Sequence, residues 1–581
     1  MGPAGGTREI LRYHAESTHH VHRFAPGPGR LDWANQPEPF RSYEGAEVLP
    51  LPLAEESDAP SWDALHRPRE GAARPLDRAA LGAFLELSLG LTAWKQLGAS
   101  RWALRANPSS GNLHPTEGYV LVPDVPGVPA GLHHYLSRDH VLEGRLTPTP
   151  AAAAALARLL PPGGFVFGLS SIHWREAWKY GLRAFRYCQH DAGHALAAAR
   201  YAAATLGWTA RVLDAPGDDD VARVLGLDRE EDFPGLAPED REHPDALVLV
   251  APPGDVDRHA RRLEAALDEL TALAGDGEWS GRPNPLSPEH VEWPEVGAVA
   301  GAAYKPRTPA AGEESSAPLS AAAVDPHGTA DPGEGPASRP RPEGSAGGRP
   351  RPDDVSTARL VRQRRSAVAM DGRTSLPASI FFHMMERLLP RPGQLPWDAL
   401  PWSPRVHPVL FVHRVDEVPP GLYVLERHPS ARDALRRALR PGFAWTRPPE
   451  VPAALPLFLL EAGDTRSFAG LASCRQEIAS ESAFSLGMLS AFESSLEEGP
   501  WWYRRLFWET GVVGQVLYLE AEAAGVRATG IGCYFDDVVH EVLGICGPTF
   551  RDLYHFTVGG AVDDPRLTTL PAYPQEVRAR A

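Results

Sequence analysis

The chain has 581 residues, more than one hydrophobic core usually holds, so we expect at least two domains. Its formal net charge of −16 disfavours nucleic acid or an anionic membrane as a partner, because the long-range field repels phosphates. Four scattered cysteines are too few for a disulfide framework, no signal peptide is visible, and no apolar run approaches the roughly 18 residues of a membrane span. These features predict a cytoplasmic protein.

The sequence of the first half predicts four elements in chain order. A strand at 118–122 comes first, followed by a long apolar helix from near Gly193 to Gly207. An acidic turn with a second helix and a strand at 246–251 follow. Residues 300–352 are rich in Pro, Gly, Ala and Ser and nearly lack large apolar residues. Such a segment cannot bury enough surface to offset the entropy of ordering it, so we predict a flexible linker there.

The second half predicts the same series of elements. A strand at 408–415 precedes a long helix from near Gly511 to Gly525, an acidic turn with a further helix, and a strand at 555–560. Helices alternating with strands imply a layered α+β domain, present twice. The predicted domains are therefore 1–299 and 353–581.

The two halves share one sequence pattern. Residues 186–227 align with 504–545 without a gap, so that Arg186 meets Arg504. Three glycine pairs and an acidic pair coincide in the same register. Two unrelated alanine-rich helices would share alanines but not these residues. We therefore predict a duplication whose copies pack as an intramolecular pseudo-dimer.

A turn of small polar residues precedes the first strand of the first half. Pro108 sets the turn, and Ser109, Ser110 and Asn112 offer hydrogen-bond donors and acceptors. Gly111 lets the backbone approach a flat ligand closely. An ordinary turn before a strand is the alternative.

Arginines cluster at the start of the second half. Arg359, Arg362, Arg364 and Arg365 fall within seven residues, and Ser366 adds a hydroxyl. The forked guanidinium group suits phosphate, which makes this segment a candidate anion site. The alternative is a solvated basic helix face.

Two glycines, Gly530 and Gly532, follow the second long helix. They permit close approach of the backbone to a ligand, but their spacing is not the dinucleotide-binding fingerprint. A tight turn is the alternative.

Taken together, these motifs resemble the nitroreductase fold, and in particular the SagB/ThcOx-type dehydrogenases that form thiazoles and oxazoles. Segments 178–208 and 364–377 carry the strongest likeness, and the resemblance covers most of both halves but not the linker. It implies two nitroreductase-like domains, each with a central mixed or antiparallel sheet flanked by helices.

The resemblance also implies FMN bound at the interface of two subunits. One subunit supplies an Arg-Arg-Ser segment to the phosphate and a Gly-rich turn near the ring, and the other supplies a Pro-Ser-Ser-x-Asn loop. The two halves of this chain hold complementary parts of that pattern: Pro108, Ser109, Ser110 and Asn112 in the first, and Arg364, Arg365, Ser366, Gly530 and Gly532 in the second. We therefore expect one composite FMN site.

The mirror-related site is predicted to be degraded. Segment 401–408 replaces the polar loop, and only Arg23, beside His20 and His22, stands where the arginine pair would lie. One departure affects the intact site as well, since Val368 occupies a position where the family often carries another basic residue.

Lys179 and Tyr180 match a Lys-Tyr pair that azoline-oxidising relatives use close to the flavin. Removing a hydride from a substrate leaves a proton, which a lysine or tyrosine with a lowered pKa can accept. The alternative is a surface lysine beside a packed aromatic residue.

The predicted function is that of an FMN-dependent oxidoreductase acting on a small organic or peptide substrate, such as an azoline. NAD(P)H, a quinone or oxygen would be the second redox partner, and the protein could be monomeric. A flavin-free scaffold or binding protein is the alternative. A metal-dependent hydrolase built on His190 and His194 is another, but no third ligand is evident, and no metal site is predicted.

Overall fold

The computed structural model describes residues 3–67, 72–309 and 355–579. Most of the predicted linker, 300–352, therefore lies outside the described residues. Its first ten residues, 300–309, are described and belong to a packed segment. Helix α10 (Pro294–Ala302) continues into it, the Lys305 side chain is buried, and Thr308 N donates to Ala215 O at 2.9 Å.

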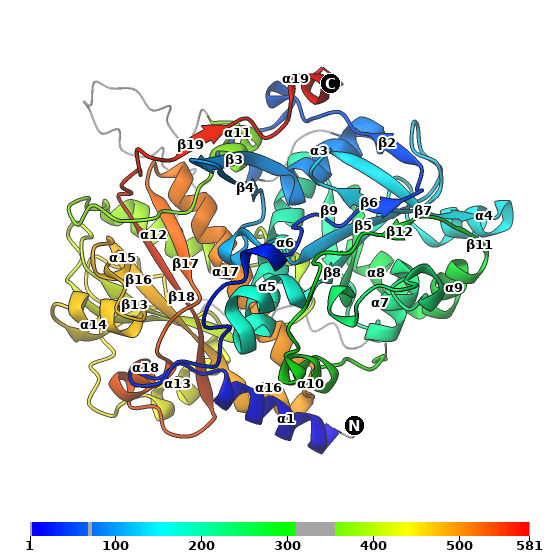
Figure 1. The fold of residues 1–581 in the computed structure, drawn as a ribbon. Helices are drawn as coiled ribbons and strands as arrows, with labels where there is room; N and C mark the ends of the chain where they lie inside the picture. Colours follow the sequence, from blue (N-terminus) through cyan, green and yellow to red (C-terminus); the bar gives the residue numbers. More distant parts are fainter. Residues whose placement is uncertain (1–2, 68–71, 310–354, 580–581) are drawn as a thin grey trace.

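Each half is built on an antiparallel sheet, and the two sheets lie side by side (Figure 1). The strands of the first sheet are β2 (Val48–Pro50), β5 (Thr116–Val122), β6 (Gly131–Leu136), β7 (Val141–Pro148), β8 (Phe165–Ser171), β9 (Thr209–Val212), β10 (His243–Ala251) and β11 (Gly277–Trp279). Those of the second are β13 (Val406–Val412), β14 (Gly421–Leu425), β15 (Leu457–Ala462), β16 (Phe484–Ala491), β17 (Arg527–Ile531) and β18 (Phe550–Gly559).

The two sheets have the same strand order over six strands. The first reads β7-β6-β5-β8-β10-β9 and the second β15-β14-β13-β16-β18-β17. Strands β2 and β11 extend the first sheet beyond this common core. The predicted α+β class, present twice, is confirmed.

Further helices and short strands surround these sheets. They are α2 (Trp62–Leu65), α3 (Arg78–Leu89), α4 (Pro150–Leu159), α5 (His173–Tyr180), α8 (Val256–Ala265), α9 (Leu267–Ala272), α12 (Ala378–Arg387), α13 (Arg432–Ala438), α14 (Arg466–Ala472), α15 (Glu477–Ser480), α16 (Phe492–Glu498), α19 (Gln575–Arg578), β1 (Tyr43–Glu44) and β12 (Arg282–Pro283). Within the described ranges, no helix has the length and apolar character needed to cross a membrane.

Two 22-residue helices, α6 (Ala184–Thr205) and α17 (Trp502–Ala523), occupy the centre of the molecule (Figure 1). Each leads into a strand, β9 or β17, and then a helix, α7 (Asp218–Leu225) or α18 (Asp536–Leu543). All three pairs of elements begin 318 residues apart, the shift that aligns the two sequences.

The predicted start of the long helices was wrong. Both helices begin nine residues before Gly193 and Gly511, which lie in the helix interiors. A Cβ on Gly511 would lie 2.9 Å from the Gly193 Cα, and a Cβ on Gly193 would overlap the Trp508 backbone. The two glycines therefore let the central helices cross in close contact.

Ion pairs at equivalent positions join the two halves. Arg186 bonds Asp536 at 3.3 Å, and Arg504 bonds Asp218 at 2.6 Å, with all four side chains buried. Residue i of one half thus contacts residue j of the other, and j contacts i, as in an interface with twofold symmetry. The halves pack as the predicted intramolecular pseudo-dimer.

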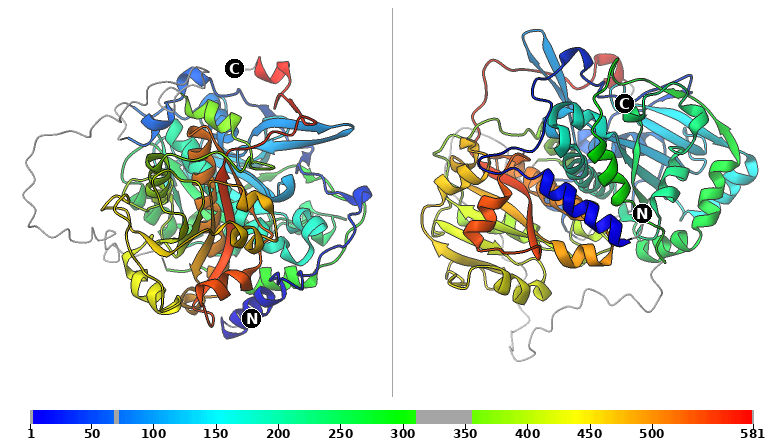
Figure 2. Two further views of the ribbon diagram at one scale, coloured as in Figure 1. Left: turned by 90° about the vertical axis from the view of Figure 1, so that its left-hand side faces the viewer. Right: turned by 60° about the horizontal axis from the view of Figure 1, so that its bottom comes forward.

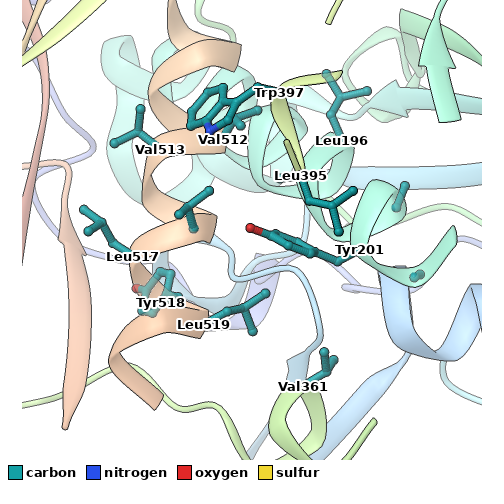
Figure 3. Packing of buried hydrophobic residues seen from close by; sticks show 14 of the residues in the cluster. Leu196, Tyr201, Val361, Leu395, Trp397, Val512, Val513, Leu517, Tyr518 and Leu519 are labelled. Atoms are coloured by element: carbon teal, nitrogen blue, oxygen red, sulfur yellow. The ribbon is translucent and has the colours of Figure 1, made fainter. Parts of the chain in front are cut away.

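A continuous hydrophobic core spans both halves. Figure 3 shows Leu519 of α17 on the same side as Tyr201 of α6, Val512 beside Trp397, and Val513 and Leu517 on the opposite side of α17, all within this one core. Since these side chains become exposed if the halves separate, the hydrophobic effect opposes separation.

Segments from each half cross onto the other. Helix α1 (Pro3–Glu16) packs beside α10 at the base of the molecule (Figure 2), and its His14 Nδ1 lies 3.2 Å from the Tyr503 hydroxyl of the second half. Helix α11 (Thr357–Gln363) contacts α2 and α3 of the first half, and β19 (Thr568–Leu570) pairs with the hairpin β3 (Leu91–Leu97) and β4 (Ser100–Arg105). The arginine-rich segment is thereby brought against the first half.

Candidate active site

A cavity of about 1340 Å³ lies between the two halves. The first half contributes the loop 108–114, the end of α5 and part of α6, and the second half contributes residues 363–368, β17 and the segment before β19. All the predicted site residues line this one cavity: Pro108, Ser109, Ser110, Asn112, Lys179, Tyr180, Arg364, Arg365, Ser366, Gly530 and Gly532. The volume exceeds that of a typical pocket for one drug-sized ligand.

The polar loop is fastened to α6 by a buried carboxylate. Ser110 donates from its backbone N to both oxygens of Asp191 at 3.2 Å and from its hydroxyl at 3.3 Å. His114 N donates to Ser109 Oγ at 2.8 Å, which closes the turn. Gly111 and Asn112 both have positive φ, at 63° and 57°. The loop is therefore a fixed structure.

Asp191 was missed by sequence analysis, although the repeat carries a signal for it. Its equivalent in α17, Glu509, accepts hydrogen bonds from the backbone N of Arg405 at 2.9 Å and of Val406 at 3.2 Å. An acidic residue at this position of the long helix thus holds the corresponding loop in each half.

A second buried carboxyl group, Glu176 of α5, interacts electrostatically with Asp191. Burial raises the pKa of Asp191 to about 7, although hydrogen bonds from Ser109 and Ser110 oppose this. Burial also raises the pKa of Glu176, and the charge of Asp191 raises it further. Neither Glu176 oxygen has a hydrogen-bond partner among the described residues. Both effects favour the uncharged form of Glu176.

Lys179 and Tyr180 end helix α5 directly beside the polar loop. A Cβ on Gly111 would lie 2.6 Å from Tyr180 Oη and 2.9 Å from Lys179 Nζ. The close neighbours of Gly111 are therefore these two side chains. The predicted lowering of the pKa is wrong for Tyr180, because burial raises its pKa well above the ordinary value. Tyr180 is therefore a hydroxyl donor at neutral pH.

The arginine-rich segment divides into two parts. Arg362 pairs with Glu86 at 2.7 Å, and Arg359 is exposed on α11, so neither faces the cavity. Beyond the end of the helix, Ser366 forms a parallel bridge with Ala528 of β17. This bridge aligns the segment with the edge of the second sheet.

Arg364 and Arg365 are positively charged groups that form no ion pair among the described residues, although the Glu522 carboxylate acts on both and raises their pKa values. Arg364 donates to Arg105 O at 3.0 Å, and its buried Nε has no described hydrogen-bond partner. Arg365 donates to Thr92 O at 3.2 Å and to Arg362 O at 2.8 Å. Burial lowers the pKa of both groups, and the charge of Arg364 adds to this in bringing the pKa of Arg365 to about 10.

Tyr518 of α17 connects the two parts that the second half contributes. Its hydroxyl lies 2.9 Å from Ser366 Oγ and accepts a hydrogen bond from Gly530 N at 3.0 Å. The Arg364 guanidinium lies 4.8 Å from the centre of its ring. Sequence analysis missed Tyr518, and no local pattern marks it.

The two glycines after α17 make close contacts with tyrosines of the protein. A Cβ on Gly530 would overlap the Tyr554 hydroxyl, and a Cβ on Gly532 would overlap the Tyr187 ring. Arg183 of the first half donates to Gly532 O at 2.7 Å. The observed reason for both glycines is therefore packing against tyrosine, although both line the cavity as predicted.

Arg105 is a further cationic group in the cavity wall, and it too was missed. It is buried and donates to Thr116 O at 3.1 Å and to Pro39 O at 2.8 Å, while its Nε has no described partner. Burial lowers its pKa to about 10.

The mirror-related region is filled by aromatic side chains. Trp402, in the segment that replaces the loop, lies 5.9 Å from Trp502 and 6.3 Å from Trp508 between ring centres. Arg505 stacks on Trp402 at 4.5 Å. At the place of the predicted histidine and arginine group, His20 bonds Asp537 at 3.0 Å and Arg23 is exposed.

His190 and His194 serve in packing. His190 stacks on Tyr554 with ring centres 4.0 Å apart and bonds Thr510 Oγ1 at 2.9 Å, while His194 Nδ1 lies 3.3 Å from Gln515. In the parts of the chain that the structure describes, no group of three or more metal-ligating side chains occurs.

Comparison with known proteins adds to this geometry. No protein-family model matches the sequence. The chain is 27% identical over 163 residues to a putative nitroreductase of Methanocaldococcus jannaschii, an alignment that covers 27% of this chain and 79% of that protein. It is 34% identical over 133 residues to the trifolitoxin-processing protein TfxB of Rhizobium leguminosarum bv. trifolii, covering 21% of this chain and 36% of that protein.

A solved structure matches almost the whole chain. The crystal structure of a putative nitroreductase from Anabaena variabilis has a TM-score of 0.63 and 19% identity, and the match covers 95% of this chain and 99% of that one. The chain has a nitroreductase-like fold. Because the match extends over nearly the full length, it includes both halves as well as the way they pack. The predicted pair of nitroreductase-like domains is confirmed at the level of fold.

Proposed function

We propose that the chain is an FMN-dependent oxidoreductase with one composite flavin site between its halves. The observation that carries this proposal is the pair of guanidinium groups, Arg364 and Arg365, that line the cavity and form no ion pair among the described residues. The Glu522 carboxylate acts on both, but burial still leaves the pKa of each below its ordinary value. A buried charge is costly unless a group of opposite charge compensates it. A phosphate dianion supplies that compensation.

The residues present fit the phosphate end of FMN. The Nε of Arg364 is a buried donor without a described partner, and Ser366 is an exposed hydroxyl next to the two arginines. Forked guanidinium donors match phosphate oxygens. In the proposed complex Arg364, Arg365 and Ser366 hold the phosphate, while Pro108, Ser109, Ser110 and Asn112 hold the ring from the first half and Gly530 and Gly532 adjoin it from the second.

Bound FMN would supply the hydride chemistry. The chain's own residues would accept the proton and donate hydrogen bonds. Lys179 Nζ accepts the proton that hydride removal leaves on the substrate. Tyr180, whose pKa burial raises, donates a hydrogen bond from its hydroxyl. Asp191 fixes the polar loop, and the raised pKa of Glu176 favours an uncharged carboxyl group beside it.

A SagB-type dehydrogenase activity on a peptide azoline is the finer form of this proposal. The relative with 34% identity is named for the processing of trifolitoxin, which supports a peptide substrate. A nitro or quinone compound is the other candidate, since two of the similar proteins are described as putative nitroreductases. The cavity is large enough for a substrate beside a flavin.

We further propose that the two halves arose by duplication and that only one of two original sites persists. The constant spacing of 318 residues between α6 and α17, β9 and β17, and α7 and α18 supports this. So do the two equivalent arginine–aspartate pairs. The tryptophans around Trp402 fill the region of the lost site. The proposed domains divide between residues 309 and 355.

Adding FMN to purified, flavin-depleted protein tests the proposal. Quenching of flavin fluorescence and a visible absorbance that stays with the protein on gel filtration are expected. Incubating the loaded protein with a thiazoline-containing peptide then tests the substrate class, with loss of two hydrogens from the peptide as the readout. Protein that binds no flavin would instead support the scaffold alternative.

A further inference from the structure

Two cysteines lie together at the cavity wall, outside the flavin-binding residues proposed above. Cys533 directly follows Gly532 and lines the cavity, and Cys474 lies just after α14. The two thiols lie close enough for each to affect the pKa of the other. Both residues are partly exposed, so a small reagent can reach them.

The backbone holds the two cysteine segments together on both sides of the pair. Phe535 N donates to Ala472 O at 2.7 Å, and the Gln476 side chain donates to Cys533 O at 3.1 Å. The contact between the thiols therefore depends on two further connections and not on rotamers alone.

Cys474 and Arg475 have an unusual backbone conformation. Their φ angles are +54° and +60°, in the left-handed region that non-glycine residues seldom adopt. Two consecutive residues of this kind persist only where the surroundings hold them, and such positions gather at functional sites.

The electrostatic setting favours a reactive thiol at Cys533. The interaction between the two thiols lowers the pKa of Cys533 and raises that of Cys474. The Arg183 guanidinium lowers the pKa of both thiols. A thiolate is the nucleophilic form of cysteine, so Cys533 is the attacking sulfur of the pair.

We propose that Cys474 and Cys533 are a redox modification site, a dithiol that hydrogen peroxide converts to an intramolecular disulfide. The Cys533 thiolate attacks one peroxide oxygen, the O–O bond breaks, and the departing hydroxide takes up a proton to form water. The resulting sulfenic acid is attacked by the Cys474 sulfur, and a second water leaves as the S–S bond forms. The two thiols thus lose two protons and two electrons, and one hydrogen peroxide becomes two waters.

Because Gly532 and Cys533 line the cavity, the new bond couples the shape of the cavity wall to the redox state of the protein. A disulfide fixes the Cα atoms of its cysteines at about 4.4–6.8 Å, which ties the end of β17 to residue 474. Dithiothreitol reverses the step by thiol–disulfide exchange and becomes oxidised itself.

Mass spectrometry of the full-length protein tests the proposal without reference to flavin. The reduced protein is freed of reductant, treated with hydrogen peroxide and alkylated in denaturant. Reduced protein carries four alkylated cysteines, and the oxidised protein is expected to carry two, with a mass lower by two hydrogens before alkylation. Proteolysis should yield one linked pair of peptides containing Cys474 and Cys533, which dithiothreitol separates.

Variants sharpen the result. Cys546→Ser, at an exposed cysteine away from the pair, should leave the linked peptides unchanged. Cys474→Ser should leave a sulfenic acid on Cys533 that dimedone traps. Wild-type protein that retains four alkylatable cysteines after peroxide would overturn the proposal. So would linkage to Cys546, or independent oxidation of the two thiols to sulfinic acids without a link.

Discussion

Replacing Arg365 by methionine separates phosphate binding from stability. Burial and the neighbouring Arg364 lower the pKa of Arg365 to about 10. At about 1.4 kcal/mol per pH unit, this corresponds to roughly 3 kcal/mol against the charged form at neutral pH, where Arg365 is protonated in both folded and unfolded protein. Methionine removes that penalty and keeps an apolar stem of similar length.

The substitution also removes four hydrogen bonds, to Thr92 O, Thr92 Oγ1, Arg362 O and Arg364 O, which contribute about 1 kcal/mol each. The two effects nearly offset each other. The unfolding free energy of the flavin-free variant should therefore lie within about 1–2 kcal/mol of the wild-type value. FMN binding should weaken much more. A charge-assisted hydrogen bond contributes about 1.5–3 kcal/mol, which predicts a Kd raised roughly 10- to 150-fold.

Flavin fluorescence titration measures this, with riboflavin as the matched ligand that lacks phosphate. Riboflavin affinity should be unchanged in Arg365→Met, and Arg359→Met, on the exposed face of α11, should bind both flavins as wild type does. If Arg365→Met weakens FMN and riboflavin equally, or weakens neither, the assignment of Arg365 to the phosphate is refuted.

Three other substitutions test separate parts of the account. Lys179→Ala should bind FMN normally but slow flavin reduction by about 10²–10⁴-fold, and unchanged turnover would remove its role as the base. Because the folded pKa of Asp191 is raised to about 7, native protein holds an extra proton and its unfolding free energy should fall by up to about 4 kcal/mol between about pH 4 and 7. In chemical unfolding experiments, Asp191→Asn should lose most of this dependence of the unfolding free energy on pH. A variant with the same pH dependence as wild type would contradict the assignment to Asp191. Gly511→Ala should destabilise the protein by several kcal/mol in thermal unfolding, because its Cβ overlaps α6, whereas Gly297→Ala, which meets nothing within 4 Å, should be neutral or stabilising.

The internal repeat made much of the fold predictable. A gapless match of glycines, an arginine and acidic residues marked the paired helices, and the structure has them 318 residues apart. The helix starts were misplaced because glycine usually weakens a helix interior. Gly193 and Gly511 are in the interior because each faces the other, and a contact between residues so distant in the chain leaves no local pattern.

The site was predictable where several functional residues are adjacent in sequence. The loop at 108–112 and the Arg-Arg-Ser segment meet in one cavity as expected. Single buried residues that act at long range, such as Arg105 and Tyr518, left no such signal. The direction of the pKa shift of Tyr180 could not be predicted from the sequence either, because burial depends on the packing of both halves.

The number of flavins bound per chain tests the central claim most directly. The protein is purified, its flavin content is restored with excess FMN, and the flavin released by denaturation is counted against the protein concentration. One FMN per chain is the predicted result, because a polar loop and two arginines that form no described ion pair meet in one cavity, while tryptophans occupy the related region. A ratio near two, or no bound FMN at all, would contradict a single composite site.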